Sequence, residues 1–488
     1  MKLQNISLTL SFNLLILGCF AQNLLNQTTE RFLKSSEFQH ATISLLVVDT
    51  QKMDTLIEHQ PNLSLPTAST AKLFSTAAAI EILGPNYRPK TLLYTDGNLT
   101  SEGVLNGNLW VIGQGDPTLG SIYFNRDGEQ QVFLKKWCDT LQQIGIKKIN
   151  GDIICDGSAF GYEGIPDGWS WGDMGNYYGA GPSGLCIYDN MLRFYFNTTA
   201  QSGMASTLLR TFPVQNDLVF FNEIRSASVQ GDNSYIYGSP YSNCRWGRGS
   251  LPVSQAQFEV KGSLPDPEKQ VGTELLQFLQ KRGVTLSGSV KTARMDSLFL
   301  KNVSKERHKL LYTHDGPTIG EIVNITNHHS INLFAEQLVC LAGYKKTGIG
   351  SISKGLDVLE QLFNASINTK GLFLKDGSGL SRSNGISAAN LVSLLVFMNQ
   401  SQHKTAFFNS LPISGKSGTL KSVCMDQSCS GKVFAKSGTM SRIKSYAGYI
   451  KTNSGKLLAF AFVLNNFEGG SKLAVRKMEA LLNQLVLL

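Results

Sequence analysis

The sequence has few charged residues and no long apolar run. Charged side chains make up 17% of its 488 residues, whereas about a quarter is usual. The net charge of +9 is not gathered into a Lys/Arg run, so a dedicated nucleic-acid-binding protein is not expected. After the first 21 residues no stretch reaches the length that a membrane span needs, about 20 apolar residues. We therefore expect no transmembrane span in the mature chain.

The first 21 residues are expected to be a secretory signal peptide. Lys2 supplies a weak positive start, and residues 8–20 are mostly apolar but too short to cross a bilayer. The small residues Cys19 and Ala21 predict cleavage after Ala21. The alternative is a lipoprotein signal in which Cys19 is lipidated. Either reading predicts an exported protein.

Cysteine and histidine lack the spacings of metal sites. There are eight cysteines without a C-x-x-C motif and seven histidines without H-E-x-x-H, so neither a metal nor a cofactor is expected. Cys424 and Cys429 flank a short loop and could pair in an oxidising compartment. The other cysteines of the mature chain are expected to be buried apolar side chains: Cys138, Cys155, Cys186, Cys244 and Cys340.

Hydrophobic periodicity predicts mixed α/β ends and a mainly β middle. A strand at 43–49 and a helix at 69–83 begin the mature chain. Between about 92 and 302, short strands alternate with Gly, Asn and Asp turns and are interrupted by helices at 129–144 and 268–282. Further helices are expected after residue 303. The chain is expected to end with three antiparallel strands and an amphipathic helix, at 432–435, 445–452, 456–464 and 472–487.

Ser69-Thr70-Ala71-Lys72 could supply a nucleophile and its base. Residues three apart on a helix share a face, so the Lys72 amine can reach the Ser69 hydroxyl. Ser69 lies in the first turn, where the helix dipole favours an oxyanion, and Lys72 could accept the Ser69 proton. The spacing alone is weak evidence, because Ser351 and Lys354, and Ser441 and Lys444, share it.

The order of the motifs strengthens the first match. Ser330-Ile331-Asn332 and Lys436-Ser437-Gly438-Thr439 follow it in the order S-x-x-K, S-D-N, K-T-G. Lys436 is expected at the end of a strand whose free edge pairs with a peptide, while its charge attracts a C-terminal carboxylate. Lys416-Ser417-Gly418 lies on the approach loop and is the alternative third motif. Lys346-Thr347-Gly348 follows a helix and lacks a strand pattern.

Two glycine motifs fail on context. Gly168-Trp169-Ser170-Trp171-Gly172 matches the nucleophile elbow G-x-S-x-G, which requires a preceding strand and a following helix. The residues on either side predict neither. Gly113-Gln114-Gly115-Asp116-Pro117 lacks the third glycine of a dinucleotide-binding loop.

With these motifs, the sequence resembles the class C low-molecular-weight penicillin-binding proteins, the D-alanyl-D-alanine carboxypeptidase/endopeptidases. Four further stretches carry the resemblance: 65–88, 107–119, 376–382 and Asp266-Pro267. It implies a multidomain α/β (α+β) protein with a serine β-lactamase/DD-transpeptidase-like catalytic domain, whose antiparallel sheet lies between helices. The catalytic domain would comprise 22–92 and 303–488, and a mainly β insertion, 93–302, would form two smaller domains.

The resemblance also implies roles for individual residues. Ser69 would be the nucleophile, Lys72 the general base and Ser330 a proton relay, while Lys436 tunes the site electrostatically. The backbone N–H groups of Ser69 and Thr439 would form the oxyanion hole. The residues expected to bind substrate are Asn332, Ser437, Gly438 and Thr439, with a side pocket formed by Met440, Ser441, Arg382 and Asp173. Two positions depart from the family pattern, Ile331 in place of Asp and Ser437 in place of Thr, and neither removes a reacting group.

The implied function is a periplasmic serine D-Ala-D-Ala carboxypeptidase/endopeptidase. Its substrates would be peptidoglycan stem peptides ending in D-Ala, and β-lactams would be covalent inhibitors. A β-lactamase or esterase could use the same site, but the sequence shows no deacylating carboxylate. A catalytically silent peptidoglycan-binding protein is the other alternative, and the intact Ser69, Lys72 and Lys436 argue against it.

Overall fold

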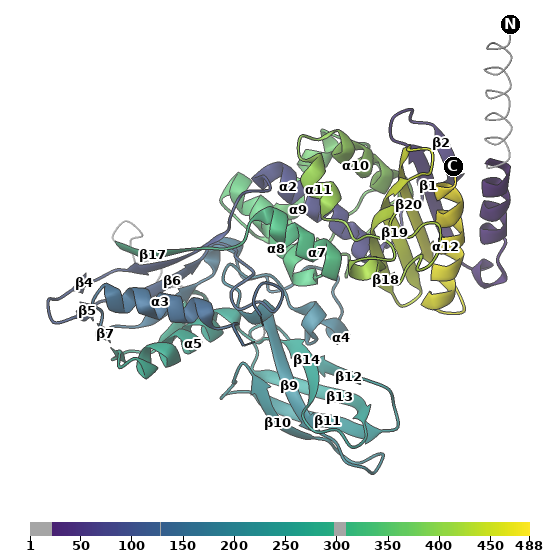
Figure 1. Ribbon diagram of the computed structural model, residues 1–488. Coiled ribbons are helices and arrows are strands. Elements are labelled where there is room, and N and C mark those ends of the chain that lie inside the picture. Colours follow the sequence, from purple (N-terminus) through teal and green to yellow (C-terminus); the bar gives the residue numbers. More distant parts are fainter. Residues whose placement is uncertain (1–21, 127, 297–308) are drawn as a thin grey trace, which may run out of the picture. The chain divides into compact units, whose positions relative to one another are not determined.

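The computed structural model describes residues 22–126, 128–296 and 309–488 (Figure 1). The chain divides into two compact units. Unit 1 comprises the residues up to Glu81, Val323–Ser330 and Glu360–Leu488, and unit 2 comprises Ile82–Ile322 and Ile331–Leu359. The expected signal peptide with Cys19 and Ala21, and the expected domain limit at 302 and 303, lie outside the described residues.

Unit 1 contains a five-stranded antiparallel sheet with the order β18-β19-β20-β1-β2. Its strands are β1 (Thr42–Asp49), β2 (Thr55–His59), β18 (Val433–Met440), β19 (Ile443–Lys451) and β20 (Leu457–Asn465). Strands from the two ends of the chain meet where β1 pairs with β20. The sequence prediction ended β18 at Ala435, which is wrong. The strand continues to Met440 because every residue from Val433 to Met440 pairs with β19, so Lys436 lies in mid-strand.

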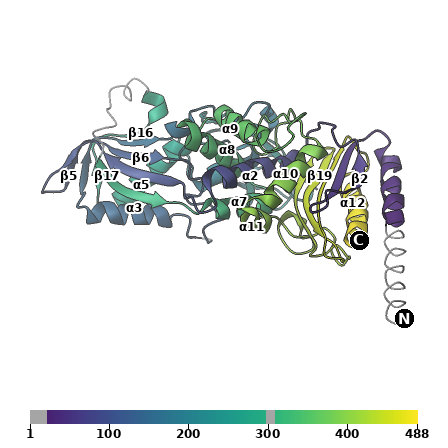
Figure 2. The ribbon, with the colours of Figure 1, turned by 90° about the horizontal axis from the view of Figure 1, so that it is seen from above.

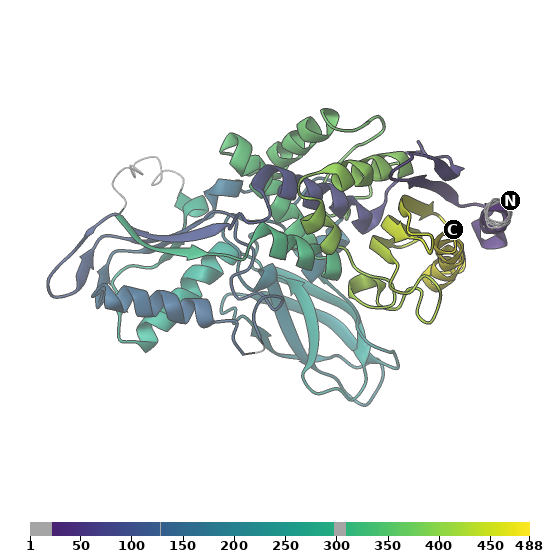
Figure 3. The ribbon, with the colours of Figure 1, turned by 45° about the horizontal axis from the view of Figure 1, so that its top comes forward.

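Helices contact both faces of this sheet (Figure 2). On one face α12 (Ser471–Val486) places Leu481 and Leu485 in one hydrophobic cluster with Val47 and Phe460. In Figure 3 this helix is the yellow C-terminal one beside the yellow strands. On the other face, α10 (Ala388–Gln400) accepts a hydrogen bond from the Tyr449 hydroxyl, at 2.6 Å from the carbonyl oxygen of Leu395. The expected amphipathic C-terminal helix therefore packs on the sheet.

The helix expected at 69–83 has two parts. The 3₁₀ turn η2 (Ala68–Ala71) is followed by α2 (Lys72–Leu83), whose first nine residues are buried. The helix ends at Leu83, as expected, and the following Gly84 has φ of +82°. Further helices in this unit are α7 (Ile319–His329) and α9 (Ile352–Asn364), which continue into unit 2, and α11 (Lys404–Asn409).

Unit 2 is mainly β, as the pattern predicts for the middle of the chain. In its described residues, the sheets have the orders β16-β8-β6-β3-β17, β15-β7-β5-β4, β10-β9-β14 and β11-β13-β12. The strands are β3 (Lys90–Thr95), β4 (Asn98–Leu99), β5 (Val104–Asn106), β6 (Leu109–Gly113), β7 (Lys148–Asn150), β8 (Ile153–Asp156), β9 (Met191–Asn197), β10 (Thr207–Phe212), β11 (Val219–Ala227), β12 (Asn233–Tyr237), β13 (Cys244–Pro252), β14 (Phe258–Ser263), β15 (Thr285–Leu286), β16 (Val290–Thr292) and β17 (Lys309–Asp315). Its helices include α3 (Val132–Gln143), α4 (Trp171–Met174), α5 (Pro267–Lys281) and α8 (Asn332–Thr347).

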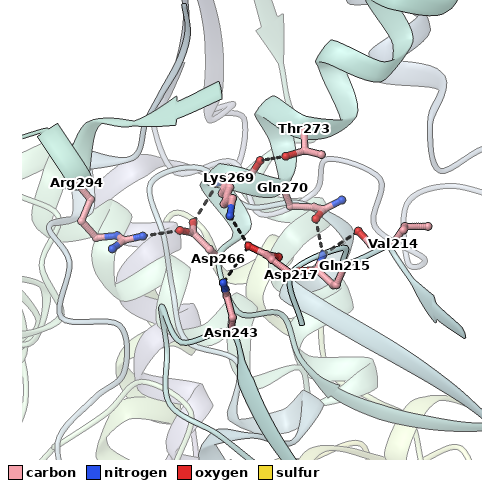
Figure 4. Close-up of polar contacts among 9 residues, drawn as sticks. All are labelled: Val214, Gln215, Asp217, Asn243, Asp266, Lys269, Gln270, Thr273 and Arg294. Atoms are coloured by element: carbon pink, nitrogen blue, oxygen red, sulfur yellow. Dashed lines mark hydrogen bonds and ion pairs between the residues drawn. The ribbon is translucent and has the colours of Figure 1, made fainter. Parts of the chain in front are cut away.

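The start of α5 is tied to the neighbouring loops of unit 2 by polar contacts (Figure 4). Asp266 is the N-cap and accepts a hydrogen bond from the Lys269 backbone N–H at 3.1 Å, and its carboxylate also binds Arg294. The Lys269 ammonium lies 2.6 Å from a carboxylate oxygen of Asp217, to which Asn243 also donates. The Asp266-Pro267 pair noted in the sequence thus starts a helix with a cap and a proline in its first turn.

The cysteines follow the sequence prediction with one exception. Cys424 and Cys429 form the expected disulfide, with their Cα atoms 5.5 Å apart. Four of the other five are buried as expected, Cys138, Cys155, Cys186 and Cys340. Cys244 is exposed, so its prediction was wrong. It is the first residue of β13, and the alternation of the strand places Arg245, not Cys244, in the interior.

The G-x-S-x-G match does not form a nucleophile elbow, and no described helix could span a membrane. A single helical turn, α4, begins at Trp171 inside the G-x-S-x-G match, although no helix was expected there. No strand leads into Ser170, however, so the geometry of a nucleophile elbow is not formed. Within 22–126, 128–296 and 309–488, no helix has the length and apolarity to cross a membrane.

Candidate active site

Ser69 lies in a turn that β19 holds in place. Ala68, immediately before it, has a left-handed backbone with φ of +48°, a conformation that costs free energy in a non-glycine residue. The Thr67 carbonyl oxygen accepts hydrogen bonds from the Ser445 hydroxyl at 2.6 Å and the Thr70 hydroxyl at 3.0 Å. Ser69 itself is partly exposed, whereas its neighbours in the turn are buried. The turn therefore presents one hydroxyl to solvent from a fixed backbone.

The amine of Lys72 contacts the Ser69 hydroxyl. Its Nζ donates to Ser69 Oγ at 2.9 Å and to the carbonyl oxygen of Ser378 at 2.7 Å, and the side chain is fully buried. The contact between Ser69 and Lys72 that the three-residue spacing predicts is thus present. A buried amine held by a carbonyl is placed to accept a proton from the hydroxyl when it is neutral.

The loop at 376–384 supplies that carbonyl. The buried Asp376 carboxylate accepts hydrogen bonds from the N–H groups of Gly379 at 2.8 Å and Ser381 at 2.7 Å, and from the Asn384 side chain at 2.7 Å. Gly379 has φ of +80°, and a Cβ there would lie 2.0 Å from the carbonyl oxygen of Ala68. Only glycine lets the loop approach the nucleophile turn this closely. Sequence reasoning noted this stretch but missed the role of the Ser378 carbonyl.

A second lysine contacts the serine of the second motif. Lys436 Nζ donates to Ser330 Oγ at 2.9 Å and to the Ser437 carbonyl oxygen at 2.9 Å. Ser330 has a left-handed backbone, with φ of +60°, between α7 and α8. Burial, followed by the positive charges of Lys72 and Lys444, holds the pKa of Lys436 well below its usual value. The first and third motifs are therefore close enough to interact electrostatically.

The free edge expected for the third motif is confirmed, because β18 is the edge strand of its sheet. Residues 412–414 cover its first half, through hydrogen bonds from Ala435 to Pro412 and from Ser414 to Val433. Backbone groups alternate in direction along a strand, so Ser437 and Thr439 direct their N–H and C=O groups to the same edge.

Gly438 allows β18 to lie against the nucleophile turn. A Cβ at this position would be 2.3 Å from the Thr67 carbonyl oxygen and 3.0 Å from the Ser69 backbone nitrogen. Such contacts would push the strand away from the turn. With glycine there, the N–H groups of Ser69 and Thr439 lie on segments in direct contact, as two donors to one oxyanion must.

Two side chains that sequence reasoning missed contact the third motif. The Ser437 hydroxyl donates to the hydroxyl of Thr419 at 2.8 Å. Thr419 directly follows the alternative motif Lys416-Ser417-Gly418, so the repeated K-S-G-T letters were a signal for this contact. Lys444 Nζ donates to the Thr439 hydroxyl at 2.7 Å. Its only signal in the sequence was the S-x-x-K match that begins at Ser441.

Asn332 and Asp173 belong to unit 2. The Asn332 amide, at the first residue of α8, donates to the Tyr178 carbonyl oxygen at 2.8 Å. Asp173 accepts hydrogen bonds from the Ser170 hydroxyl at 2.6 Å and the Tyr178 hydroxyl at 3.2 Å. Their roles in substrate binding stay predictions.

The other side-pocket residues belong to unit 1. Arg382 is exposed on the 376–384 loop, Met440 is partly buried at the end of β18, and Ser441 is exposed in the turn that follows. Their shared role in a pocket stays a prediction. In the described part of the chain, no cluster of three or more His, Cys, Asp and Glu side chains could hold a metal ion.

The sequence is similar to those of known proteins over most of its length. A model of the D-Ala-D-Ala carboxypeptidase 3 (S13) family matches residues 25–485. A D-alanyl-D-alanine carboxypeptidase of Actinomadura sp. is 28% identical over 466 residues, which cover 93% of this chain and 83% of that protein. The penicillin-sensitive carboxypeptidase A of Dictyostelium discoideum is 25% identical over 434 residues, covering 82% of this chain and 77% of that protein.

Solved structures share the fold. The crystal structure of penicillin binding protein 4 (dacB) from Haemophilus influenzae matches with a TM-score of 0.79 at 20% identity, over 94% of this chain and 98% of that one. The structure of the same protein complexed with a β-lactam matches with a TM-score of 0.74, over 95% and 97% of the two chains.

Proposed function

Because the chain belongs to the D-Ala-D-Ala carboxypeptidase 3 (S13) family, we propose that Ser69 is the nucleophile with which it hydrolyses the D-Ala-D-Ala ends of peptidoglycan stem peptides. The chain is a serine-type D-Ala-D-Ala carboxypeptidase. The observation that carries the assignment of Ser69 is the 2.9 Å hydrogen bond from Lys72 Nζ to Ser69 Oγ. In addition, Gly438 of the third motif lies against the backbone of Ser69.

In the acylation step, Ser69 Oγ attacks the carbonyl carbon of the penultimate D-Ala. Neutral Lys72 accepts the hydroxyl proton, and the Ser378 carbonyl keeps the amine in position for this transfer. The bond from Oγ to carbon forms, and the carbonyl π electrons move onto the oxygen. The N–H groups of Ser69 and Thr439 stabilise this oxyanion, and each such donor typically lowers the barrier by a few kcal/mol.

The leaving amine needs a proton, and Ser330 is proposed to deliver it. Ser330 Oγ accepts a hydrogen bond from Lys436, so its own O–H remains a donor. The proton that Lys72 took from Ser69 can pass through Ser330 to the nitrogen as the C–N bond breaks and D-alanine leaves. Water then attacks the acyl-enzyme carbonyl, Lys72 again accepts a proton, and Ser69 is released with its hydroxyl restored.

The substrate is proposed to bind along the open edge of β18. An extended peptide can pair with the backbone groups of Ser437 and Thr439, while the charge of Lys436 attracts its C-terminal carboxylate. We propose that Ser437 binds this carboxylate and that Asn332 holds the amide of the stem peptide. Met440, Ser441, Arg382 and Asp173 are proposed to form the side pocket for the amine-bearing side chain.

A catalytic domain of the serine β-lactamase/DD-transpeptidase type, comprising 22–92 and 303–488, is proposed together with an insertion of two smaller domains at 93–302. The pairing of β1 with β20, strands from opposite ends of the chain, supports a discontinuous domain.

We also propose export to the periplasm. The apolar segment of the first 21 residues supports export, and the disulfide between Cys424 and Cys429 fits an oxidising compartment. Cleavage of peptide cross-links, in addition to the terminal D-Ala, is likewise a proposal.

Labelling with a fluorescent penicillin tests the assignment of Ser69. The wild type is expected to form a covalent adduct and to release D-Ala from a peptide ending in D-Ala-D-Ala, and Ser69→Ala is expected to lose both. The matched control is Ser351→Ala. Ser351 belongs to another S-x-x-K match, in which Lys354 forms an ion pair with Asp357. A label that survives Ser69→Ala would exclude this nucleophile. Rapid turnover of nitrocefin would instead indicate a β-lactamase.

A further inference from the structure

Lys444 is a buried lysine that the acyl-transfer steps above do not use. Only 7% of the residue is exposed, and its Nζ donates to the hydroxyl of Thr439 at 2.7 Å. The two residues are direct cross-strand partners in the pairing of β18 with β19. Because Thr439 is an exposed residue at the open edge of β18, the buried ammonium contacts the site through a hydroxyl that a substrate can reach.

The surroundings of Lys444 contain no balancing acid. Its ammonium lies 4.7 Å from the centroid of the Tyr446 ring, and no carboxylate of the described residues forms an ion pair with it. The ionisable groups near this region are Lys436 on β18, whose pKa is lowered in part by Lys72 and Lys444, and Glu479 of α12, which interacts with Tyr446. Burial lowers the pKa of Lys444 to about 8. An unpaired buried ammonium is costly, and an anion bound at the strand edge would reduce that cost.

The hydrogen bond also determines what the Thr439 hydroxyl can do. An ammonium is only a donor, so the Thr439 oxygen must accept, and its O–H is left to donate to another group. The same relation holds on the other side of the strand edge, where the exposed Thr419 hydroxyl accepts from Ser437. The hydroxyls of Thr439 and Thr419 each accept a hydrogen bond and therefore keep an O–H that can donate to a bound group.

We propose that Lys444 is a positioning residue that directs the Thr439 hydroxyl, as a hydrogen-bond donor, to the terminal carboxylate of the substrate and adds positive charge behind it. The inference rests on the proposed function, because it assigns the group that distinguishes a free peptide terminus from a blocked one. A carboxylate accepts a hydrogen bond from Thr439 and is attracted by the ammonium, whereas a terminal carboxamide has no charge to attract.

The test compares two peptides that differ only at the terminus. Release of D-Ala from an N-acylated peptide ending in D-Ala-D-Ala, and of D-alaninamide from its C-terminal carboxamide, is measured by mass spectrometry. Lys444→Met is expected to lower kcat/KM for the carboxylate peptide about 10- to 100-fold, the usual range for a lost charge-assisted hydrogen bond. The loss should lie mainly in KM. For the carboxamide the change should be less than about 3-fold, and Lys444→Arg should restore most of the preference.

The control variant is Lys451→Met, which removes a lysine from the exposed end of the same strand, where its ammonium lies over the Phe434 ring. It should leave both peptides unaffected. The thermal midpoint of each variant shows whether it has folded. If Lys444→Met lowers kcat/KM equally for both peptides, or for neither, the inference is overturned. If the wild type releases no D-Ala at all, the proposed function itself has failed.

The pH profile gives a readout that a merely structural role would not change. The ammonium is charged below its pKa, so the preference for the carboxylate peptide should be full at pH 6.5 and decline as the pH rises through about 8. Taking the ratio of kcat/KM for the two peptides removes the titration of Lys72, which affects both. Lys436 also attracts the carboxylate, but its titration is common to the wild type and Lys444→Met. The decline of the ratio through about pH 8 that is due to Lys444 should therefore be present in the wild type and absent in Lys444→Met. A wild-type ratio that is constant from pH 6.5 to 9.5 would contradict the proposal.

Discussion

Lys436 donates a hydrogen bond to Ser330 Oγ at 2.9 Å although the two residues are 106 positions apart in the chain. The lysine lies in the edge strand of a sheet. The serine lies between two helices and has a left-handed backbone. Both backbones constrain the contact, because strand pairing fixes one partner and the φ of +60° fixes the other. The lysine is fully buried, so this contact is kept at a cost in stability.

Replacing Lys436 with methionine should separate activity from stability. The substitution removes the donor that orients Ser330 and the charge that attracts the substrate, so kcat/KM for a D-Ala-D-Ala peptide should fall about 100-fold. Removing a buried ammonium should leave the thermal midpoint unchanged or raise it. Steady-state kinetics and calorimetry on one preparation measure both quantities. Lys456→Met, in the exposed turn before β20, is the control. Unchanged kinetics would contradict the role of Lys436.

Asp376 should be as important for stability as for catalysis. Its carboxylate accepts hydrogen bonds from Gly379, Ser381 and Asn384, and Asp376→Ala would leave these buried donors without that acceptor. We expect a loss of about 3 kcal/mol or more in the free energy of unfolding. The kcat should fall as well, because the Ser378 carbonyl would no longer hold Lys72.

Urea unfolding and D-Ala release measure these two effects. Asp376→Asn, which keeps one acceptor oxygen, should be milder in both respects. Asp357→Ala, at an exposed position of α9, should change the stability by less than about 0.5 kcal/mol. A fully active and stable Asp376→Ala would contradict the proposed function of the loop.

Glu268 in unit 2 should make the protein less stable as the pH rises. Burial, then the charges of Asp266 and Asp156, raises the pKa of Glu268 from 4.5 to about 8, although Arg294 and Ser183 oppose the shift. Below pH 4.5 the carboxyl is protonated in both states. Between about 4.5 and 8 it ionises only in the unfolded chain, which binds fewer protons, so stability falls through this window. The cost should reach roughly 3 to 5 kcal/mol at pH 8.

Glu268→Gln tests this dependence, because the amide keeps a polar group of the same shape and does not ionise. The difference in unfolding free energy between the variant and the wild type should be small at pH 4.5 and should grow in favour of the variant up to pH 8. Glu58→Gln, at an exposed position of β2, is the matched control. A difference that does not depend on pH would show that Glu268 is ionised in the folded protein.

The disulfide between Cys424 and Cys429 should contribute modestly to stability. It closes a loop with a sequence separation of 5, for which chain entropy predicts about 2 kcal/mol. The loop is also anchored to α12, because the Cys424 N–H donates to Glu479 and the Cys429 N–H to Asn483. Alanine at both positions should lower the unfolding free energy by about that amount and leave D-Ala release intact. Cys244→Ser, at the exposed cysteine, should change neither. A loss of activity on removing the disulfide would place the loop in the site.

Short stretches of the sequence were enough to predict much of the catalytic core. The contact between Ser69 and Lys72 follows from a three-residue spacing on one helical face, and the disulfide follows from two cysteines across a short loop. Short, mainly apolar runs predicted β1, β19 and β20 to within two residues, and nearly every residue of these strands is buried because helices pack on both faces of the sheet. Each of these features depends on residues that are close together in the chain.

Other features depend on contacts between distant segments, and only the tertiary structure decided them. Lys72 meets the Ser378 carbonyl across 306 positions, and Lys436 meets the Ser330 hydroxyl across 106. The length of β18 and the exposure of Cys244 were mispredicted for the same reason, since pairing partners and the direction of a strand face are not encoded in a short window. The sequence determined which reacting groups the protein has. Packing decided which carbonyls, hydroxyls and charges surround them, because these neighbours are set by long-range contacts.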